Sequence, residues 1–436
     1  MIATDTLYSI SVRNLIQEVE PRKYRIDRES YPHFCPPGAG HWGMVKMAFQ
    51  VPEIAVVFVI PMGCGRHGGI ATMKEGLAGS LSYLPIAEVD IVTGDHLEKT
   101  EEALSELIEE DSPKGIMLFT TCIDDLLGSD YDSVFFRLER KYKVPIRRAK
   151  MNPLMSLSKK PPDMMIYNSM HDFLQNKEKI PRLYNVIGTP CPIDPESEIH
   201  SIFSNAGLKP LQHIGNFKTF ESHMALGHAV GNLLIGIAGL RAVEDMKKKL
   251  GQSFLPVYSI FRPEGISENY RLLEEYLGVK LETEEYQKEL LSFIDSKKQF
   301  LEGKTAVIGT TLQAAPFELA RFLTELGMKV RYITAGFIRP YEREHIPWLE
   351  ENSPDLKIIP SVEPSLSSVK EPVEHVDYGF GLDTPAYFDV DYLIDISNDD
   401  NLFGYIGTIK LIDKILEADE YNMSIKELVY SQNLVV

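Results

Sequence analysis

Short apolar runs rich in β-branched residues alternate along the chain with longer segments whose apolar positions recur at helical spacing. The runs that predict strands are IAVVFVI (54–60), GIMLFTT (115–121), LYNVIG (183–188), TAVIGTT (305–311), KVRYIT (329–334) and YLIDIS (392–397). The segments that predict helices are 99–111, 197–207, 269–278, 314–327 and 407–418. A repeated order of strand, turn and helix is typical of parallel sheets flanked by helices. The pattern therefore predicts an α/β fold.

Two polar breaks divide this pattern. Residues 156–165 contain a Lys-Lys-Pro-Pro sequence, and the polar stretch 295–305 precedes a new predicted strand. A chain of 436 residues is long enough for two or three domains. We predict three Rossmann-like α/β domains around a central cleft, covering residues 1–175, 176–300 and 301–436.

Composition limits the classes of function. The formal net charge is −18 and the pI is near 5.1, whereas nucleic-acid and anionic-membrane surfaces need clustered Lys and Arg. No apolar run is long enough to span a bilayer, and the first residues do not resemble a signal peptide. We expect a cytoplasmic protein that contacts neither nucleic acid nor membrane.

Four cysteines are too few for a disulfide scaffold in a chain of this length, so their positions are informative. Cys64 and Cys122 directly follow predicted strands, at the edge where open parallel sheets bind ligands. Cys35 lies in a loop rich in Pro and Gly. Three separated thiolates suit an iron–sulfur cluster better than zinc, which usually takes close C-x-x-C pairs. The alternative is that these are buried structural cysteines.

The turn after the first predicted strand also permits a nucleotide reading. Residues 63–68 fit G-x-G-x-x-G, and Glu88 and Asp90 follow at the distance that the dinucleotide fingerprint requires. However, a proline ends the strand, and bulky residues fill a turn whose backbone would have to lie close to a pyrophosphate. Both features disfavour nucleotide binding. In the cluster reading, Gly63 and Gly65 instead give the cysteine between them room for a cofactor.

Several segments together resemble the nitrogenase component 1 family, which includes the molybdenum–iron protein subunits, their cofactor-assembly scaffold paralogues and dark-operative protochlorophyllide reductases. The segment FTTCIDDLLGSDYD (119–132) is the most specific match. The supporting matches are IPMGCGRHGG (60–69), DIVTGDHLEKTEEAL (90–104), YNVIG (184–188), GKTAVIGTT (303–311), ELGMKV (325–330) and FGYIGTIKLIDKI (403–415). They occur in the family's order over most of the chain.

The resemblance implies that Cys35, Cys64 and Cys122 ligate a cluster at a subunit interface. The cluster is either [4Fe-4S] or an eight-iron cluster like the P-cluster. The partner is an identical or homologous subunit, in a homodimer or an α2β2 assembly. A separate ATP-dependent iron protein delivers the electrons. No G-x-x-x-x-G-K-[ST] motif occurs, so we expect no ATP site in this chain.

Two departures from the family matter for function. The nitrogenase catalytic subunit holds its cofactor with one Cys and one His, but the matching segments 231–239 and 391–400 contain neither residue. The chain therefore resembles an anaerobic oxidoreductase subunit that reduces a small or unsaturated substrate, or a scaffold for metal-cluster assembly. A subunit that lacks the active site is a further alternative.

Five further residues are weaker site candidates. His67 flanks Cys64 and is a candidate catalytic proton relay, although it can equally order the loop. Cys191 follows a predicted strand and is a candidate fourth ligand or proton donor. The alternative is that it is a structural thiol. His375 is a candidate for the cleft side of the third domain. Arg147 and Arg148 are candidates for binding an anionic substrate group, or form an ordinary solvated basic patch.

Overall fold

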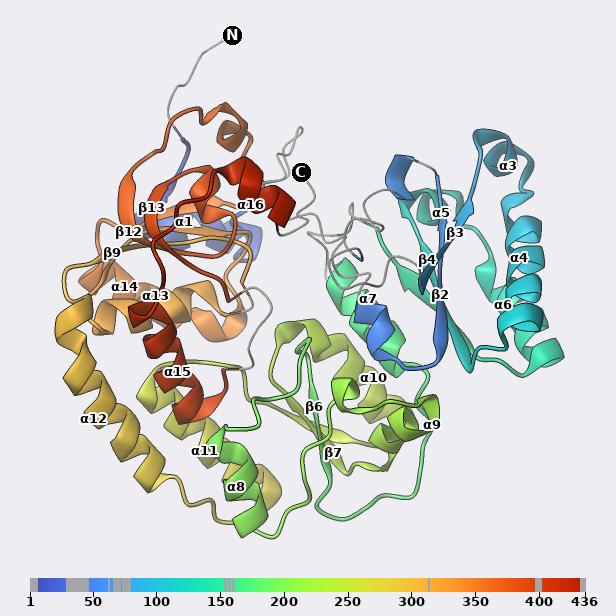
Figure 1. The fold of residues 1–436 in the computed structure, drawn as a ribbon, viewed down its shortest axis with the longest axis horizontal. Helices are drawn as coiled ribbons and strands as arrows, with labels where there is room; N and C mark the ends of the chain where they lie inside the picture. The colour runs from blue at the N-terminus through green and yellow to red at the C-terminus, as the bar shows by residue number, and fades with distance from the viewer. Residues whose placement is uncertain are drawn as a thin grey trace.

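The computed structural model describes residues 7–28, 47–61, 63–65, 72, 80–152, 155, 158, 161–312, 314–396 and 402–431. Within these residues the strands form three sheets, each flanked by helices. Figure 1 places them in separate lobes, with β2–β4 at the right, β6 and β7 at the bottom, and β9, β12 and β13 at the upper left. The predicted α/β class with parallel sheets flanked by helices is confirmed. The predicted domain boundaries stay a prediction.

The first sheet has the order β3-β2-β4-β5, and every pair is parallel. Its strands are β2 (Ile54–Ile60), β3 (Leu81–Pro85), β4 (Gly115–Thr120) and β5 (Ile146–Lys150). Its helices are α3 (Glu88–Thr93), α4 (His96–Asp111), α5 (Cys122–Leu127), α6 (Tyr131–Tyr142) and α7 (Pro162–His171). Figure 1 shows α4 and α6 on its outer side and α7 on the side facing the rest of the molecule.

The second sheet has the order β6-β7-β8, with Gln212 bridging to Asn185 in parallel at the outer side of β6. Its strands are β6 (Tyr184–Ile187), β7 (Gly231–Leu234) and β8 (Ser253–Pro256). Its helices are α8 (Glu198–Asn205), α9 (Phe220–His223), α10 (Leu240–Leu250), α11 (Pro263–Leu277) and α12 (Glu284–Leu301). Helix α10 packs against α7, which joins the second sheet to the first.

The third sheet has the order β1-β11-β10-β9-β12-β13, and it is parallel except for β1. Its strands are β1 (Ile10–Ser11), β9 (Thr305–Ile308), β10 (Lys329–Ala335), β11 (Lys357–Pro360), β12 (His375–Phe380) and β13 (Asp389–Ile394). Its helices are α1 (Val12–Val19), α13 (Pro316–Glu325), α14 (His345–Asn352) and α16 (Ile425–Ser431), whereas α15 (Gly404–Leu416), which follows β13 in the chain, packs against α8, α11 and α12 of the second sheet. The N-terminal β1 and α1 therefore lie with the third sheet, which Figure 1 shows in blue among orange elements.

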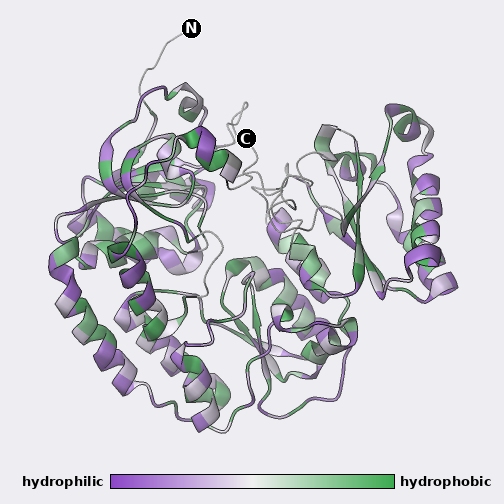
Figure 2. Cartoon of the chain, in the orientation of Figure 1, coloured by the Kyte–Doolittle hydropathy of each residue, from purple (hydrophilic) through white to green (hydrophobic). Residues whose placement is uncertain are grey.

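The central strands are apolar on both faces because helices cover them on both sides. All six residues of β4 and the last five of β2 are buried. Figure 2 shows green strands inside each lobe and purple along the outer faces of α4 and α12. This is the pattern expected for parallel sheets, whose strands read as continuous hydrophobic runs.

The chain order defines one switch point in each sheet, between the two strands from which the chain proceeds in opposite directions. It lies between β2 and β4, between β6 and β7, and between β9 and β12. Ligands of open α/β sheets bind at this point, at the carboxyl ends of the strands.

Protein groups fill the second and third of these switch points. After β6, a side chain at Gly188 would lie 2.2 Å from the carbonyl oxygen of Gly236, so the two backbones are in contact. After β9, the carboxylate of Asp383 accepts hydrogen bonds from the backbone N–H and hydroxyl groups of Thr310 and Thr311, at 2.8 to 3.1 Å.

A buried carboxylate joins α8 to the start of α15. Glu198 of α8 accepts hydrogen bonds from the backbone N–H of Tyr405 (2.7 Å) and Ile406 (3.2 Å), at the start of α15, and from the hydroxyl of Tyr270 (2.8 Å). Gly404 has a φ of +78°, and a side chain there would overlap Glu198. The Gly-Tyr-x-Gly sequence is therefore needed for this contact.

All six predicted strands and all five predicted helices are present, with ends that differ by a few residues.

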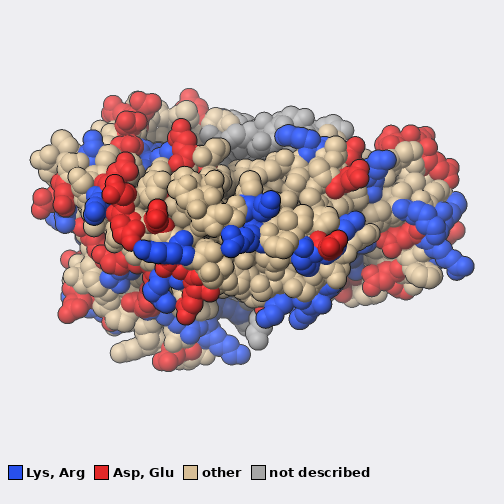
Figure 3. Space-filling view, turned by 90° about the horizontal axis from the view of Figure 1, so that it is seen from below, with Lys and Arg blue, Asp and Glu red and all other residues tan. Residues whose placement is uncertain are grey.

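In the described part of the chain, no helix is both long and apolar enough to cross a membrane. Figure 3 shows Lys and Arg interspersed with Asp and Glu at both ends of the lower face, with a broad stretch of other residues between them.

Candidate metal centre

Cys64 lies in a short helical turn directly after β2. The carbonyl oxygen of Pro61 accepts hydrogen bonds from the backbone N–H of Cys64 (2.9 Å) and Gly65 (3.3 Å). A side chain at Gly65 would lie 3.5 Å from the ring of Tyr83, whereas one at Gly63 would meet none of the described residues within 4 Å. The free, half-buried Cys64 packs against the hydrophobic core.

Cys122 is the first residue of α5, directly after β4 and the capping residue Thr121. The buried carboxylate of Asp124 accepts hydrogen bonds from the backbone N–H of Thr121 (2.9 Å) and from the hydroxyl of Tyr131 (2.7 Å). Burial and the nearby carboxylate raise the pKa of Tyr131, so its hydroxyl remains a donor. These contacts fix the turn that carries Cys122.

The two cysteines flank the switch point of the first sheet. Strands β2 and β4 pair in parallel from Ile54 opposite Gly115 to Phe58 opposite Phe119, so their carboxyl ends lie at the same edge. Both thiols are free, and thiolates are the ligands that iron–sulfur clusters take in proteins. The donor chemistry and the position both fit a cluster here.

A charged network lies beside Cys122. The carboxylate of Asp125 accepts hydrogen bonds from Lys150 (2.8 Å) and Asn152 (2.9 Å), and it lies 3.6 Å from the guanidinium of Arg148. Partial burial raises the pKa of Asp125. The hydrogen bonds from Lys150 and Asn152 and the nearby positive charges together outweigh this effect, so the net shift of the pKa is downward. Asp125 therefore stays ionised and neutralises the basic end of β5.

The two arginines predicted to bind an anionic substrate group are engaged with the protein. Arg147 donates to a carboxylate oxygen of Glu139 (2.8 Å) and to the carbonyl oxygen of Asp172 (2.9 Å). Arg148 donates to the hydroxyl of Thr120 (2.9 Å), and its guanidinium lies 4.9 Å from the ring centre of Tyr131. Their role in substrate binding stays a prediction.

Exposed apolar side chains surround the same edge of the first sheet. They are Tyr83 of β3, Val89 and Val92 of α3, and Leu126 and Leu127 of α5. Val92 is 85% and Leu126 is 76% exposed. Contiguous exposed apolar surface marks contact sites in soluble proteins. The adjacent leucines after Cys122 were the sequence signal for this rim, which the sequence analysis missed.

The other site candidates lie elsewhere. Cys35 and His67 fall outside the described residues. Cys191 follows β6 as a half-buried residue, and its carbonyl oxygen accepts a hydrogen bond from the hydroxyl of Thr189 (2.9 Å). His375 is the exposed first residue of β12, at the amino end of the strand, 3.2 Å from Asp389 and 3.6 Å from Asp391.

The described residues contain no group of three or more His, Cys, Asp or Glu side chains placed to hold a metal ion. Of the three predicted ligands, Cys64 and Cys122 lie among the described residues, and the third, Cys35, lies outside them. The ligand set stays a prediction.

Comparison with known proteins identifies the family. The model of nitrogenase component 1 type oxidoreductases matches residues 40–374. The chain belongs to this family. The family resemblance predicted from the sequence is thus confirmed.

Individual members of the nitrogenase component 1 family show how far the likeness extends. The chain is 25% identical over 336 residues to the nitrogenase molybdenum–iron protein alpha chain of Methanosarcina barkeri, covering 72% of this chain and 61% of that protein. It is also 25% identical over 139 residues to the nitrogenase iron-molybdenum cofactor biosynthesis protein NifE of Rhizobium meliloti, covering 31% of this chain and 29% of NifE. The chain thus spans less than two thirds of the length of these relatives.

A solved structure supports the fold of this nitrogenase component 1 family member. The structure described as nitrogenase Cp1 at pH 6.5 has a TM-score of 0.69, with 16% identity, over 90% of this chain and 94% of that chain. At this identity the likeness shows the fold alone.

The nucleotide alternative loses one of its supports. Asp90, which the fingerprint would place on a ribose, is buried and accepts hydrogen bonds from the backbone N–H of Ala87 (3.0 Å) and from Lys99 (2.5 Å). It lies in the first turn of α3 and is already paired. Residues 63–65 form the helical turn described above, and the rest of the G-x-G-x-x-G stretch lies outside the described residues.

Proposed function

We propose that the chain is a cluster-bearing subunit of a nitrogenase-like reductase. It ligates an iron–sulfur cluster through Cys35, Cys64 and Cys122 at an interface with an identical or homologous subunit. It takes electrons from a separate ATP-dependent iron protein and reduces a small or unsaturated substrate.

One observation carries the proposal. Two free thiols follow adjacent parallel strands, on either side of the switch point of the first sheet. Family membership supports the same reading.

The residues of this chain have defined tasks in the proposal. An iron–sulfur cluster supplies reversible one-electron transfer. Cys64 and Cys122 contribute thiolates, and none of the described residues would lie within 4 Å of a side chain at Gly63. Asp124 holds the backbone that presents Cys122, because a ligand on a loosely held turn would lose metal affinity.

The apolar rim supports a partner subunit at the same edge. Tyr83, Val92 and Leu126 are exposed on β3, α3 and α5, elements of the sheet that carries the two cysteines. A partner that covers these side chains would also keep water away from a cluster between the subunits. Solvent exclusion of this kind adjusts the reduction potential.

The first experiment measures iron. The chain is purified without oxygen, alone and with any homologous subunit encoded beside it, and iron and acid-labile sulfide are determined. We expect a brown protein with equal amounts of both, and loss of both in the variants Cys64→Ser and Cys122→Ser. The matched control Cys191→Ser should retain the parent's iron. Colourless protein in every preparation, or equal iron in all three variants, would contradict the proposal.

A scaffold for cluster assembly is the second candidate. The observation that favours it is the local similarity to NifE, the biosynthesis protein named above. Electron uptake separates the two functions. A reductase subunit should be reduced by an iron protein only while ATP is hydrolysed, whereas a scaffold should release its metal cluster to an acceptor apoprotein without this step.

A further inference from the structure

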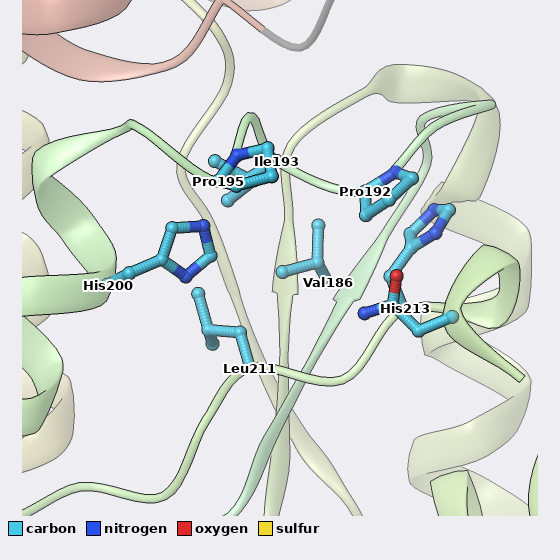
Figure 4. Close-up of a pocket in the computed structure, with 8 residues that line it drawn as sticks. Val186, Pro192, Ile193, Pro195, His200, Leu211 and His213 are labelled. Carbon is cyan, nitrogen blue, oxygen red and sulfur yellow. The ribbon is translucent and has the colours of Figure 1, made fainter.

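A cavity of about 240 Å³ opens at the carboxyl end of β6, in the second sheet. Figure 4 shows Val186 of β6 between His200 and Leu211 on one side and Pro192 and His213 on the other. Exposed Asn216 also lines the cavity. None of these residues belongs to the proposed cluster site.

The cavity has mostly apolar walls. Its apolar lining residues are Val186, Pro192, Ile193, Pro195 and Leu211. At the packing density of protein interiors, a cavity of this size holds a ligand of about ten to twelve non-hydrogen atoms. A ligand of this size with a mainly apolar surface is a small ring system.

Besides the exposed amide of Asn216, the cavity offers a hydrogen-bond acceptor on His200. His200 Nε2 lies 3.1 Å from the carbonyl oxygen of Asp194, which can only accept, so this nitrogen carries the proton and Nδ1 has a lone pair. No described residue donates to that Nδ1. His213 has no free nitrogen, because Nε2 donates to the carbonyl oxygen of Thr189 (3.1 Å) and Nδ1 accepts from the backbone N–H of Gly215 (3.0 Å).

The surroundings disfavour a phosphate. The carboxylates of Asp194 and Glu196 share the single ammonium of Lys410, at 2.6 Å each, which leaves a net negative charge beside the cavity. At the neighbouring switch point, the contact between Gly188 and Gly236 removes the space where α/β sheets bind pyrophosphate.

We propose that this cavity binds a neutral, planar nitrogen heterocycle of purine size, which donates an N–H hydrogen bond to His200 Nδ1. The apolar walls provide the contact area, and the histidine selects rings that carry a donor. This site is independent of the proposed cluster, so either proposal can fail without the other.

Two matched probes test the proposal on the full chain. 9-Methyladenine carries an amino donor, and 9-methylpurine has the same ring without one. Binding is followed by saturation-transfer NMR and titration calorimetry at neutral pH. We expect 9-methyladenine to bind at least about tenfold more tightly than 9-methylpurine, since one hydrogen bond is worth about this ratio. Adenosine monophosphate should bind more weakly than 9-methyladenine.

Variants identify the site. His200→Phe keeps an aromatic ring but removes the acceptor, so the preference for 9-methyladenine should fall to near one. Leu211→Trp fills the cavity and should abolish binding of both probes, with its circular dichroism melt checked against the parent. His228→Phe is the control, because His228 lies outside the cavity and its Nδ1 bonds to the carbonyl oxygen of Glu178.

Three results would overturn the proposal. They are equal affinity for the two probes in the parent, an unchanged preference in His200→Phe, and undiminished binding in a folded Leu211→Trp. If Leu211→Trp does not fold, the test depends on the ratio of the affinities of His200→Phe for 9-methyladenine and 9-methylpurine.

Discussion

Acid should weaken the junction between the first and second sheets, because His171, His213 and His223 are buried there. His171 ends α7, and the other two lie in the segment between the Gln212 bridge and β7. Burial lowers the pKa of His213 to about 4 and that of His223 to about 3, and the proximity of His171 lowers both further. Neither ring nitrogen of His223 meets the distance and angle of a hydrogen bond to a described residue. The nearby backbone of Met170 raises the pKa of His223, but by less than burial lowers it.

The size of the effect follows from proton linkage. The unfolded chain binds a proton to each histidine below a pKa of about 6.5, whereas the folded chain does not at pH 5. This contribution is therefore complete above pH 6.5 and is lost as the pH falls. At pH 5 the loss is about 2 kcal/mol for His223 and about the same for His213, since each pKa unit is worth about 1.4 kcal/mol.

The variant His223→Phe separates the contribution of His223 from that of other groups that titrate between pH 8 and pH 5. Buried Glu318 changes in the opposite sense, because burial raises its pKa to about 7 and its contribution to stability is lost as the pH rises through that value. Comparing His223→Phe with the parent cancels Glu318. The phenyl ring has a shape close to that of imidazole and lies among Phe217 and Phe220.

The assay is urea unfolding followed by circular dichroism at pH 8 and pH 5. The free energy of unfolding of the parent should fall between these pH values by about 2 kcal/mol more than that of His223→Phe. His228→Phe should behave like the parent. Equal losses in the parent and His223→Phe would refute the reasoning, because they would mean that His223 is protonated in the folded protein or exposed to solvent.

Three further substitutions test single contacts. Asp124→Ala removes the acceptor for Thr121 and Tyr131, so we expect a loss of about 2 to 3 kcal/mol in urea unfolding and less bound iron after anaerobic purification; unchanged values for both would contradict the role given to this carboxylate. Gly404→Ala places a methyl group on Glu198 and should lower the thermal midpoint clearly more than Gly278→Ala, which has a similar φ but free space around it; equal shifts would argue against the contact. Asp383→Asn replaces two acceptor oxygens by one and should cost about 1.5 to 3 kcal/mol in urea unfolding, whereas a neutral effect would mean that the loop holds without the carboxylate.

Two of the predicted strands have both faces buried, whereas β13 was also predicted although it lies at a sheet edge with two of its six residues buried, and the fully buried β7 was not predicted. The runs 54–60 and 115–121 are continuous apolar segments because helices cover β2 and β4 on both sides. The strand β5 was missed because it lies at the sheet edge, where Arg147, Arg148 and Lys150 interrupt the apolar pattern. Edge strands tolerate charge, so periodicity alone does not reveal them.

The candidate site was predictable only in part. That Cys64 and Cys122 follow strands was visible in the sequence, but their placement on either side of one switch point needed the strand order. The roles of Asp124 and Asp125 were not visible, because one carboxylate is buried on Tyr131 and the other faces the basic end of β5. Two adjacent acidic residues carry no sequence signal for such different partners.

The filled switch points have a consequence for selectivity. All three sheets share an arrangement that elsewhere receives nucleotides and cofactors, yet Asp383 and the contact of Gly188 with Gly236 occlude two of the three places. An incoming anion would have to displace a native carboxylate or separate two packed backbones. If the proposed cluster forms, this occlusion leaves the first sheet as the one switch point, among those described, that is not filled by the groups named here.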